Sequence, residues 1–214
     1  MQVQVFVQDL KKGTLYLERV QDSILVVVDS IQINKEKPIV LEADLNHPEL
    51  FYLQLDRNKA DDLDNRISFF GEAGNLSIQT NLDDYVTNAE IVGSSTQDLF
   101  NSYNKVINQF NNEELDLIAA YLQAQISKNN DSLALIDKQS TNLIKRKILF
   151  TANFAVNNSN SVIAPYLALY NLTSDARSLL DTIAASMSDE VRNSRYGKEL
   201  TDYLITSRPE SDPR

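Results

Sequence analysis

Cysteine and tryptophan are absent from this 214-residue chain, which also has only one histidine, five glycines and five prolines. Without cysteine the chain can form no disulfide, no thiol nucleophile and no thiolate-bound metal site. A Ser-His-Asp arrangement or a histidine-rich metal site would have to use His47, the single histidine. These absences exclude several common active-site chemistries before any motif is considered.

Long apolar runs are also missing, and no stretch approaches the ~18 residues that a membrane-spanning helix needs. Met1 is followed at once by the alternating segment 2–7, which has the pattern of a strand and lacks the charged start of a signal peptide. Two interpretations stay open. The protein is cytoplasmic, or an initiator methionine replaces a leader.

Basic residues are fewer than acidic ones: the chain has 20 Lys and Arg and 30 Asp and Glu, which gives a formal net charge of −10. Nucleic-acid and anionic-lipid surfaces both need clustered Lys and Arg, so we expect no nucleic-acid partner. Most of the acidic excess lies in the first 95 residues. Such a surface favours solubility and could also attract a cationic partner.

The first half of the chain has apolar residues at every second position, which is typical of half-buried strands. The run Ile24–Val28 is continuously aliphatic, and we expect it to be buried on both faces or at the centre of a sheet. About eight short strands at this spacing predict an antiparallel β-sandwich or open barrel, whose edges a partner could extend.

The second half has apolar residues at helical spacing and starts near Ser95 and Asp98, a pair suited to a helix N-terminus. Stripes over 99–110 and 115–126 predict two helices, and 132–158 predicts a long third one. The sequence thus predicts an α+β fold. Its parts are a β-sandwich-like domain at 1–93, a helical domain at 94–206 and a flexible tail at 207–214.

Three segments partly match the patterns of a calcium loop, a phosphate loop and a nucleic-acid patch, but each lacks a required feature. The acidic loop 56–64 lacks the glycine of a calcium loop and contains Lys59, so we expect a solvated loop. The segment 71–74 lacks the third glycine and following helix of a phosphate loop, which favours a hairpin turn. The triplet 145–147 is too short for a nucleic-acid patch.

Catalytic groups are hard to assemble from what remains. His47 stands between Asn46 and Pro48, a turn-like context, and no spacing singles out a pair of carboxylates for acid–base work. We therefore predict that the protein is not an enzyme. We assign no catalytic, cofactor-binding or metal-binding residue and expect no cofactor.

A recurring triplet of Asp, a hydroxyl residue and an aliphatic residue occurs four times. It resembles the O-glycosylation sequon of envelope proteins in Bacteroidota, although an Asp-Ser pair before an apolar run is also a common turn or helix cap. The candidate modified residues are Ser23, Ser30, Ser132 and Thr182.

Several segments resemble a Bacteroidota family of unknown function. They include 13–17, 51–53 and the strand-to-helix segment 91–94 in the first half, and 160–166 and 194–200 in the second. The family's domain stands before a thioredoxin-like domain in envelope thiol–disulfide oxidoreductases and is often lipid-anchored. The redox domain would begin near Leu204, and this chain has no Cys-x-x-Cys, so oxidoreductase activity does not carry over.

The resemblance implies an exported accessory module. We expect a non-catalytic protein of the cell envelope, in the periplasm or at the outer membrane. It would be the mature part of a lipoprotein and would bind or assemble with a protein partner. Membrane association would come only from a lipid anchor upstream of residue 1. The alternative is a small-ligand binder, or a carboxylate-based enzyme, with a cleft between the β and α halves.

Overall fold

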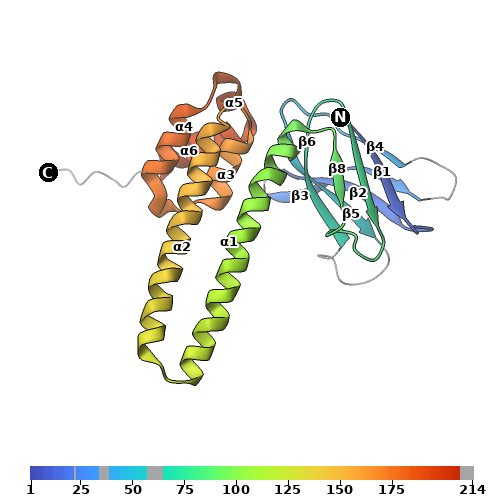
Figure 1. Cartoon of the computed structure of the whole chain (residues 1–214). Helices are drawn as coiled ribbons and strands as arrows, with labels where there is room; N and C mark the ends of the chain where they lie inside the picture. The colour runs from blue at the N-terminus through green and yellow to red at the C-terminus, as the bar shows by residue number, and fades with distance from the viewer. Residues whose placement is uncertain (22, 34–38, 57–64, 208–214) are drawn as a thin grey trace. The chain divides into compact units, whose positions relative to one another are not determined.

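The structure is a computed structural model that describes residues 1–21, 23–33, 39–56 and 65–207 (Figure 1). The chain divides into two compact units, Met1–Leu99 and Phe100–Arg214. The first unit holds eight strands in two sheets, and helices follow it. The prediction of an α+β protein with an N-terminal β-sandwich is therefore confirmed.

The sandwich consists of two four-stranded sheets, with strand orders β4-β1-β7-β8 and β3-β2-β5-β6. From β1 to β5 the chain passes from one sheet to the other three times, and once, from β2 to β3, it adds the next strand to the same sheet. The strands are β1 (Gln2–Gln8), β2 (Thr14–Gln21), β3 (Ile24–Gln32), β4 (Ile39–Glu42), β5 (Glu49–Asp56), β6 (Arg66–Gly71), β7 (Asn75–Asn81) and β8 (Glu90–Val92).

Alternation along the strands builds the core of the sandwich. In β1, Val3, Val5 and Val7 are buried while the glutamines between them are exposed, as the period of two predicts. Phe51 and Phe69 come from neighbouring strands, are fully buried, and stack with ring centroids 6.0 Å apart. Large aliphatic and aromatic side chains thus fill the space between the sheets.

Two connections differ from the sequence-based prediction. β1 pairs in parallel with β7, so the sandwich is not purely antiparallel. The segment 71–74 was expected to be a hairpin turn, but it joins β6 of one sheet to β7 of the other. That expectation is wrong because turn residues indicate a reversal of the chain and not which strand the chain pairs with next.

The junction from β8 to α1 (Ser95–Ile126) depends on a glycine. Gly93 has φ +102°, and an added Cβ would overlap the Asn75 carbonyl oxygen, so both conformation and space require glycine. We expected Ser95 to cap the helix. Instead the Ser94 hydroxyl accepts a hydrogen bond from the Gln97 backbone N–H at 3.0 Å, so the cap lies one residue earlier.

The second unit contains most of α1, followed by α2 (Asn130–Asn157) and a group of shorter helices. We expected separate helices over 99–110 and 115–126, but α1 runs through both as one helix. The segment between them has no glycine or proline to stop it. The shorter helices are α3 (Ile163–Asn171), the 3₁₀ turn η2 (Ser174–Ala176), α4 (Arg177–Ser186), α5 (Asp189–Asn193) and α6 (Arg195–Thr206).

The core of the helical unit combines small residues with large aliphatic ones. Its buried cluster contains five alanines, of which Ala155 and Ala164 are fully buried. An added Cβ at Gly197 would overlap the Val191 carbonyl oxygen. Small side chains let neighbouring helices approach closely, and the large aliphatic residues fill the space that remains.

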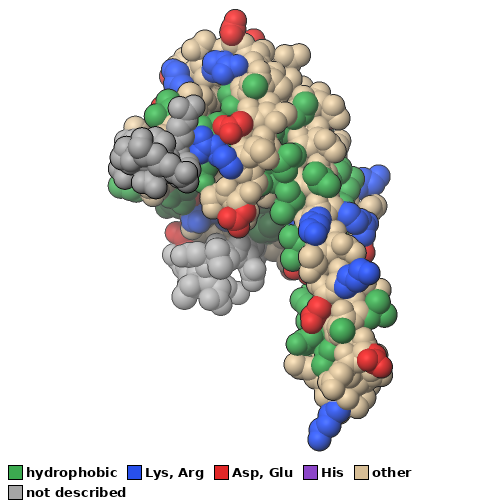
Figure 2. Space-filling view, turned by 90° about the vertical axis from the view of Figure 1, so that its left-hand side faces the viewer, with side chains coloured by type: hydrophobic (Ala, Val, Ile, Leu, Met, Phe, Trp, Pro, Cys, Tyr) green, Lys and Arg blue, Asp and Glu red, His purple; other side chains and the backbone are tan. Residues whose placement is uncertain are grey.

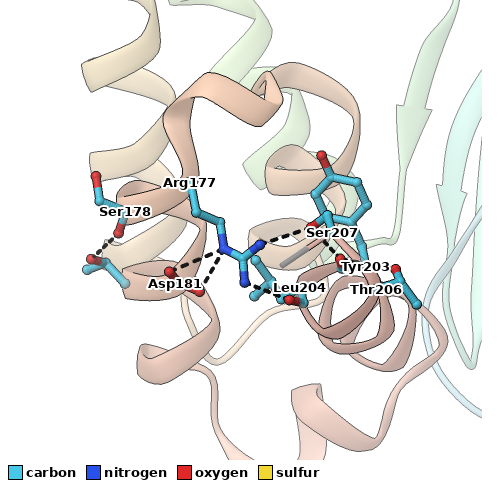
Figure 3. Close-up of polar contacts among 8 residues, drawn as sticks. Arg177, Ser178, Asp181, Tyr203, Leu204, Thr206 and Ser207 are labelled. Atoms are coloured by element: carbon cyan, nitrogen blue, oxygen red, sulfur yellow. Dashed lines mark hydrogen bonds and ion pairs between the residues drawn. The ribbon is translucent and has the colours of Figure 1, made fainter. Parts of the chain in front are cut away.

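Arg177 ties the start of α4 to the end of α6 (Figure 3). Its guanidinium donates to the Leu204 carbonyl oxygen at 2.6 Å and to the Ser207 hydroxyl at 3.0 Å. The same group pairs with the Asp181 carboxylate at 3.2 Å. A cation at a helix C-terminus satisfies carbonyl groups that have no partner within the helix.

Candidate functional site

The first half of β3, residues 24–28, is the most exposed apolar strand segment that the structure describes, and we call it the β3 edge. β3 stands at one end of its sheet and, with nine residues, is the longest described strand (Figure 1). Ile24 is 67% exposed, Val27 52% and Val26 36%. The expectation that this run would be buried is therefore wrong.

The exposed side chains of the β3 edge lie on both faces of the strand. In the register with β2, Val26 lies opposite Arg19 and Val27 opposite Glu18. Successive residues point to opposite faces, so Ile24 and Val26 share one face while Val27 lies on the other. The ladder to β2 is interrupted at Leu17/Glu18, which separates the β3 edge from the rest of the strand.

In the described part of the chain, the second half of β3 is bonded to a neighbouring strand through a side chain, whereas the β3 edge is not. Asp29 Oδ2 accepts a hydrogen bond from the Glu42 backbone N–H of β4 at 2.8 Å. At the far edge of the same sheet, the Phe70 N–H of β6 donates to Gln97 Oε1 at 2.7 Å. Among the described residues, no side chain bonds to the backbone of 24–28 in this manner.

An open groove lies beside the β3 edge, between it and the end of β4, with a volume of about 550 Å³. Arg19, Glu42 and Asp44 give it both signs of charge, and Val28 contributes an apolar wall. Arg19 also donates to the Asp44 carbonyl oxygen at 3.3 Å across this groove. Such a lining can accept a polar peptide backbone or a zwitterionic group, but it holds no nucleophile–base pair.

A buried ion pair lies on the outer face of the same sheet. Glu18 is 7% exposed, and its carboxylate lies 3.5 Å from the Arg66 guanidinium. Arg66 also donates to Gln54 at 2.8 Å and lies over the Tyr52 ring at 5.9 Å. Because each charge already faces its counterpart, the pair holds β2, β5 and β6 together and presents no reactive group.

The groups with perturbed pKa values have structural explanations. Burial alone would raise the pKa of Glu72, but hydrogen bonds from the backbones of Ser95 and Thr96 and from the hydroxyls of Thr96 and Ser94 outweigh it and lower the pKa. Burial raises the pKa of Tyr103, whose hydroxyl lies 3.0 Å from that of Thr151. Glu72 caps α1 and Tyr103 joins α1 to α2, so neither lines a reaction site.

His47 and the acidic loop are the places where the sequence had raised catalytic or metal-binding chemistry. His47 lies at a bend between β4 and β5 and is half-buried. Within the described ranges, no three His, Asp or Glu side chains come together in a way that could hold a metal ion. Of the acidic loop at 56–64, residues 57–64 lie outside the described residues. None of the described helices has the length and apolarity required to cross a membrane.

The triplet 145–147 lies on α2 and faces in several directions. Arg146 pairs with Glu113 of α1 at 2.9 Å and lies 5.3 Å from the centre of the Phe110 ring. Lys147 lies 3.6 Å from the Glu114 carboxylate. These contacts join the two long helices and leave no basic patch in this stretch.

The four candidate glycosylation residues lie in different kinds of local structure: a turn, a strand and two helices. Ser23 is exposed in the β2–β3 turn with φ +64°, although Asp22 before it lies outside the described residues. Ser30 is exposed within β3. Ser132 lies in the first turn of α2, and Thr182 lies within α4, where its hydroxyl donates to the Ser178 carbonyl oxygen at 2.8 Å.

Sequence reasoning missed the β3 edge because strand position depends on pairing with distant residues. One signal was available. Only two residues separate β2 from β3, which marks a hairpin whose second strand can be last in its sheet. The run of β-branched residues showed strand preference but carried no information about whether both sides were occupied.

Comparison with known proteins gives one match, and it falls on the unit that carries the β3 edge. No curated protein and no solved structure matches the chain. The expected similarity to a family of unknown function is confirmed for the first unit. Residues 1–100, which contain all the strands described above and the first turn of α1, match the family model described as "Domain of unknown function (DUF4369)".

Proposed function

We propose that this protein is a non-catalytic module of the cell envelope that binds a protein partner by strand addition at the β3 edge. One observation carries the proposal: a nine-residue edge strand whose first half exposes Ile24, Val26 and Val27. Natural sheets protect such strands with charges, proline or covering segments, because free N–H and C=O groups invite another strand. The β3 edge has none of the first two.

Strand addition accounts for the distribution of cover along β3. Asp29 closes the second half against β4, so a partner strand has only the segment 24–28 to extend. Main-chain hydrogen bonds would supply affinity there, and alternate side chains would supply specificity. The partner is therefore expected to offer an extended segment of about five residues with aliphatic side chains on both faces.

The groove beside the β3 edge gives the partner a second contact. Arg19 and Glu42 line it with opposite charges, so a partner residue of either sign can find a counterpart. The chain's net charge of −10 favours a cationic segment in the approach to the surface. These features support recognition of a protein segment, since the groove is open and polar.

The envelope location belongs to the same proposal. It rests on the resemblance to exported domains, and the four Asp-hydroxyl-aliphatic triplets are candidate modification sites if the protein is exported. Among the candidate residues, Ser23 is the best placed for modification, because it is exposed in a turn. Thr182 is the poorest, because its hydroxyl is engaged within a helix. A lipid anchor upstream of residue 1 would hold the module at a membrane.

The test is a pull-down from native envelope extract with the tagged full chain, at low and moderate salt. We expect a stoichiometric partner to remain bound at moderate salt, because apolar and main-chain contacts are not screened. The double variant Ile24→Lys/Val27→Lys should lose it. The matched control is Val92→Lys in β8, an edge strand of the other sheet, where the side chain is 66% exposed.

Two results would overturn the proposal. One is a partner that binds the double variant as well as the parent chain. The other is a chain that recovers no partner but retains a small molecule through purification, with loss of that molecule in Arg19→Ala. The second result would favour the alternative of a small-ligand binder, because Arg19 and Glu42 line the groove.

A further inference from the structure

We propose that the protein forms a two-fold symmetric dimer through the outer face of α1, independently of any partner at the β3 edge. Four aliphatic residues define this face, which we call the α1 stripe: Leu115, Ile118, Leu122 and Ile126. They are 63%, 51%, 55% and 78% exposed. Their spacing of three, four and four places them on one side of the helix, as in a coiled-coil seam.

The α1 stripe lies away from the helix that α1 already contacts. Tyr103 of α1 stacks on Phe150 of α2 and bonds to Thr151, which fixes the side of α1 that faces α2. Farther along that side, Ala124 is buried. Ala124 follows Leu122 by two residues, which is about 200° around a helix. Contact with α2 therefore cannot cover the α1 stripe.

The surroundings of the α1 stripe lack the charges that usually solvate a helix surface. No charged residue occurs from 117 to 127, where alanine, glutamine and serine accompany the apolar residues. On the face of the long helices that Figure 2 shows, hydrophobic side chains lie next to acidic and basic ones toward the free end. An uncharged apolar face of this length favours burial against another helix.

Charge at the two ends of the α1 stripe selects a second copy in antiparallel orientation. Glu113 and Glu114 precede the stripe, Asp116 comes directly after its first residue, and Lys128 lies beyond its end. Arg146 and Lys147 of the same chain compensate for two of these acids, which leaves one net negative charge. An antiparallel pair brings that charge to within about one helical turn of Lys128 of the other copy at both ends, whereas a parallel pair sets like charges together.

Two-fold symmetry also matches the stripe to itself. An axis through its middle places Leu115 of one copy beside Ile126 of the other, and Ile118 near Leu122. The contact covers only about 18 Å of helix, at 1.5 Å per residue. Its area falls in the class of weak interfaces, below ~1,200 Å², so we expect a dimer that dissociates on dilution.

Analytical ultracentrifugation of the full chain over a hundredfold concentration range tests the dimer. We expect a concentration-dependent dimer for the parent and a monomer for Ile118→Glu/Leu122→Glu. The control is Leu135→Glu/Ile144→Glu, which changes two α2 residues that are 58% and 55% exposed and should leave the dimer intact. Circular dichroism would show that both variants keep their helices. A monomeric parent, or equal loss in the control, overturns the proposal.

The orientation has its own test, because a chain without cysteine can form only the disulfides that are introduced. Leu115→Cys and Ile126→Cys are prepared separately, mixed and mildly oxidised. We expect the mixed disulfide to exceed either self-linked product, since antiparallel pairing brings the two positions together. Predominant self-linking of Leu115→Cys would overturn the antiparallel arrangement. The pull-down with β3 variants is unaffected by either result, so the two proposals can fail separately.

Discussion

The two units bury their apolar residues in different ways. The sandwich core consists of Phe, Leu, Ile, Val and Tyr side chains, with Ala43 as its only alanine among the described buried residues. The helical core contains five alanines, and a glycine lies where α6 approaches α5. Several other large aliphatic side chains of the second unit reach the surface on α1. Removing volume therefore tests the packing of the sandwich, and adding volume tests the close helix approach in the second unit.

The largest effect is expected from Phe69→Ala in the sandwich. Phe69 is fully buried and stacks on Phe51, so its removal leaves a cavity that the two sheets cannot close. We expect the free energy of unfolding to fall by about 4 kcal/mol. Urea denaturation measures this loss, and hydrogen exchange would show it in residues 1–99. A loss below about 1 kcal/mol would contradict the description of this core as tightly packed.

Adding a methyl group should matter almost as much in the helical unit. In Gly197→Ala the new Cβ would overlap the Val191 carbonyl oxygen and lie 2.8 Å from the Arg192 Cα, both backbone atoms that cannot rotate away. We expect a loss of about 3 kcal/mol in the free energy of unfolding, from displacement of α6 against α5. Thermal denaturation gives the value. Gly74→Ala serves as the comparison, because nothing lies within 4 Å of its Cβ position but its φ of +122° disfavours alanine, so any loss there comes from backbone conformation and not from crowding.

The contrast between the units also explains what the sequence could predict. Val3, Val5 and Val7 alternate with polar residues, and this local pattern predicted β1 correctly. The parallel pairing of β1 with β7 joins residues more than seventy positions apart, as Gln2 with Asn75, and no local pattern encodes it. The same limit applies to Ile24, whose exposure depends on which strand comes last in the sheet.

In the helical unit, the sequence predicted the apolar stripes but not which of them are buried. The apolar spacing of Leu115 and Ile118 was correctly interpreted as helical, yet the structure exposes both. Periodicity shows that a face is apolar and not what lies against it. Continuity of α1 was missed because two stripes on different faces look like two helices, although nothing between them breaks the chain. For both candidate surfaces, the β3 edge and the α1 stripe, the sequence therefore predicted the secondary structure correctly but not the exposure of the side chains.

A smaller effect is expected at the point where the units join in sequence. The Glu72 carboxylate accepts hydrogen bonds from the Ser95 and Thr96 backbone N–H groups at 2.7 and 3.2 Å, at the positive end of α1. Glu72→Ala should cost about 1 kcal/mol, a value that solvent screening keeps modest. Chemical denaturation measures it, and Glu90→Ala, an exposed acid on β8, is the control.

The pH dependence of that contribution has a definite sign. The pKa of Glu72 is lowered in the folded state, so its contribution is complete above the unfolded-state value of 4.5 and is lost as the pH falls through the folded-state value. The parent should therefore lose more stability than Glu72→Gln on acidification below this point. Parallel denaturation curves for the two proteins across this range would contradict the assignment of Glu72 as an ionised cap.

The smallest effect on stability is expected where the two units expose their aliphatic residues. Ile24→Thr in β3 and Leu122→Gln in α1 remove side chains that are 67% and 55% exposed. Because little of either side chain leaves water when the chain folds, the free energy of unfolding should change by less than about 0.5 kcal/mol. Dilute samples measure this value for the monomer. At high concentration Leu122→Gln, but not Ile24→Thr, should lower the melting temperature relative to the parent. The reason is that Leu122→Gln alone loses the stability gained from association through the α1 stripe. A loss of about 2 kcal/mol in dilute solution for either variant would mean that the residue belongs to a core of its own unit, and the contrast between buried and exposed aliphatic residues would fail.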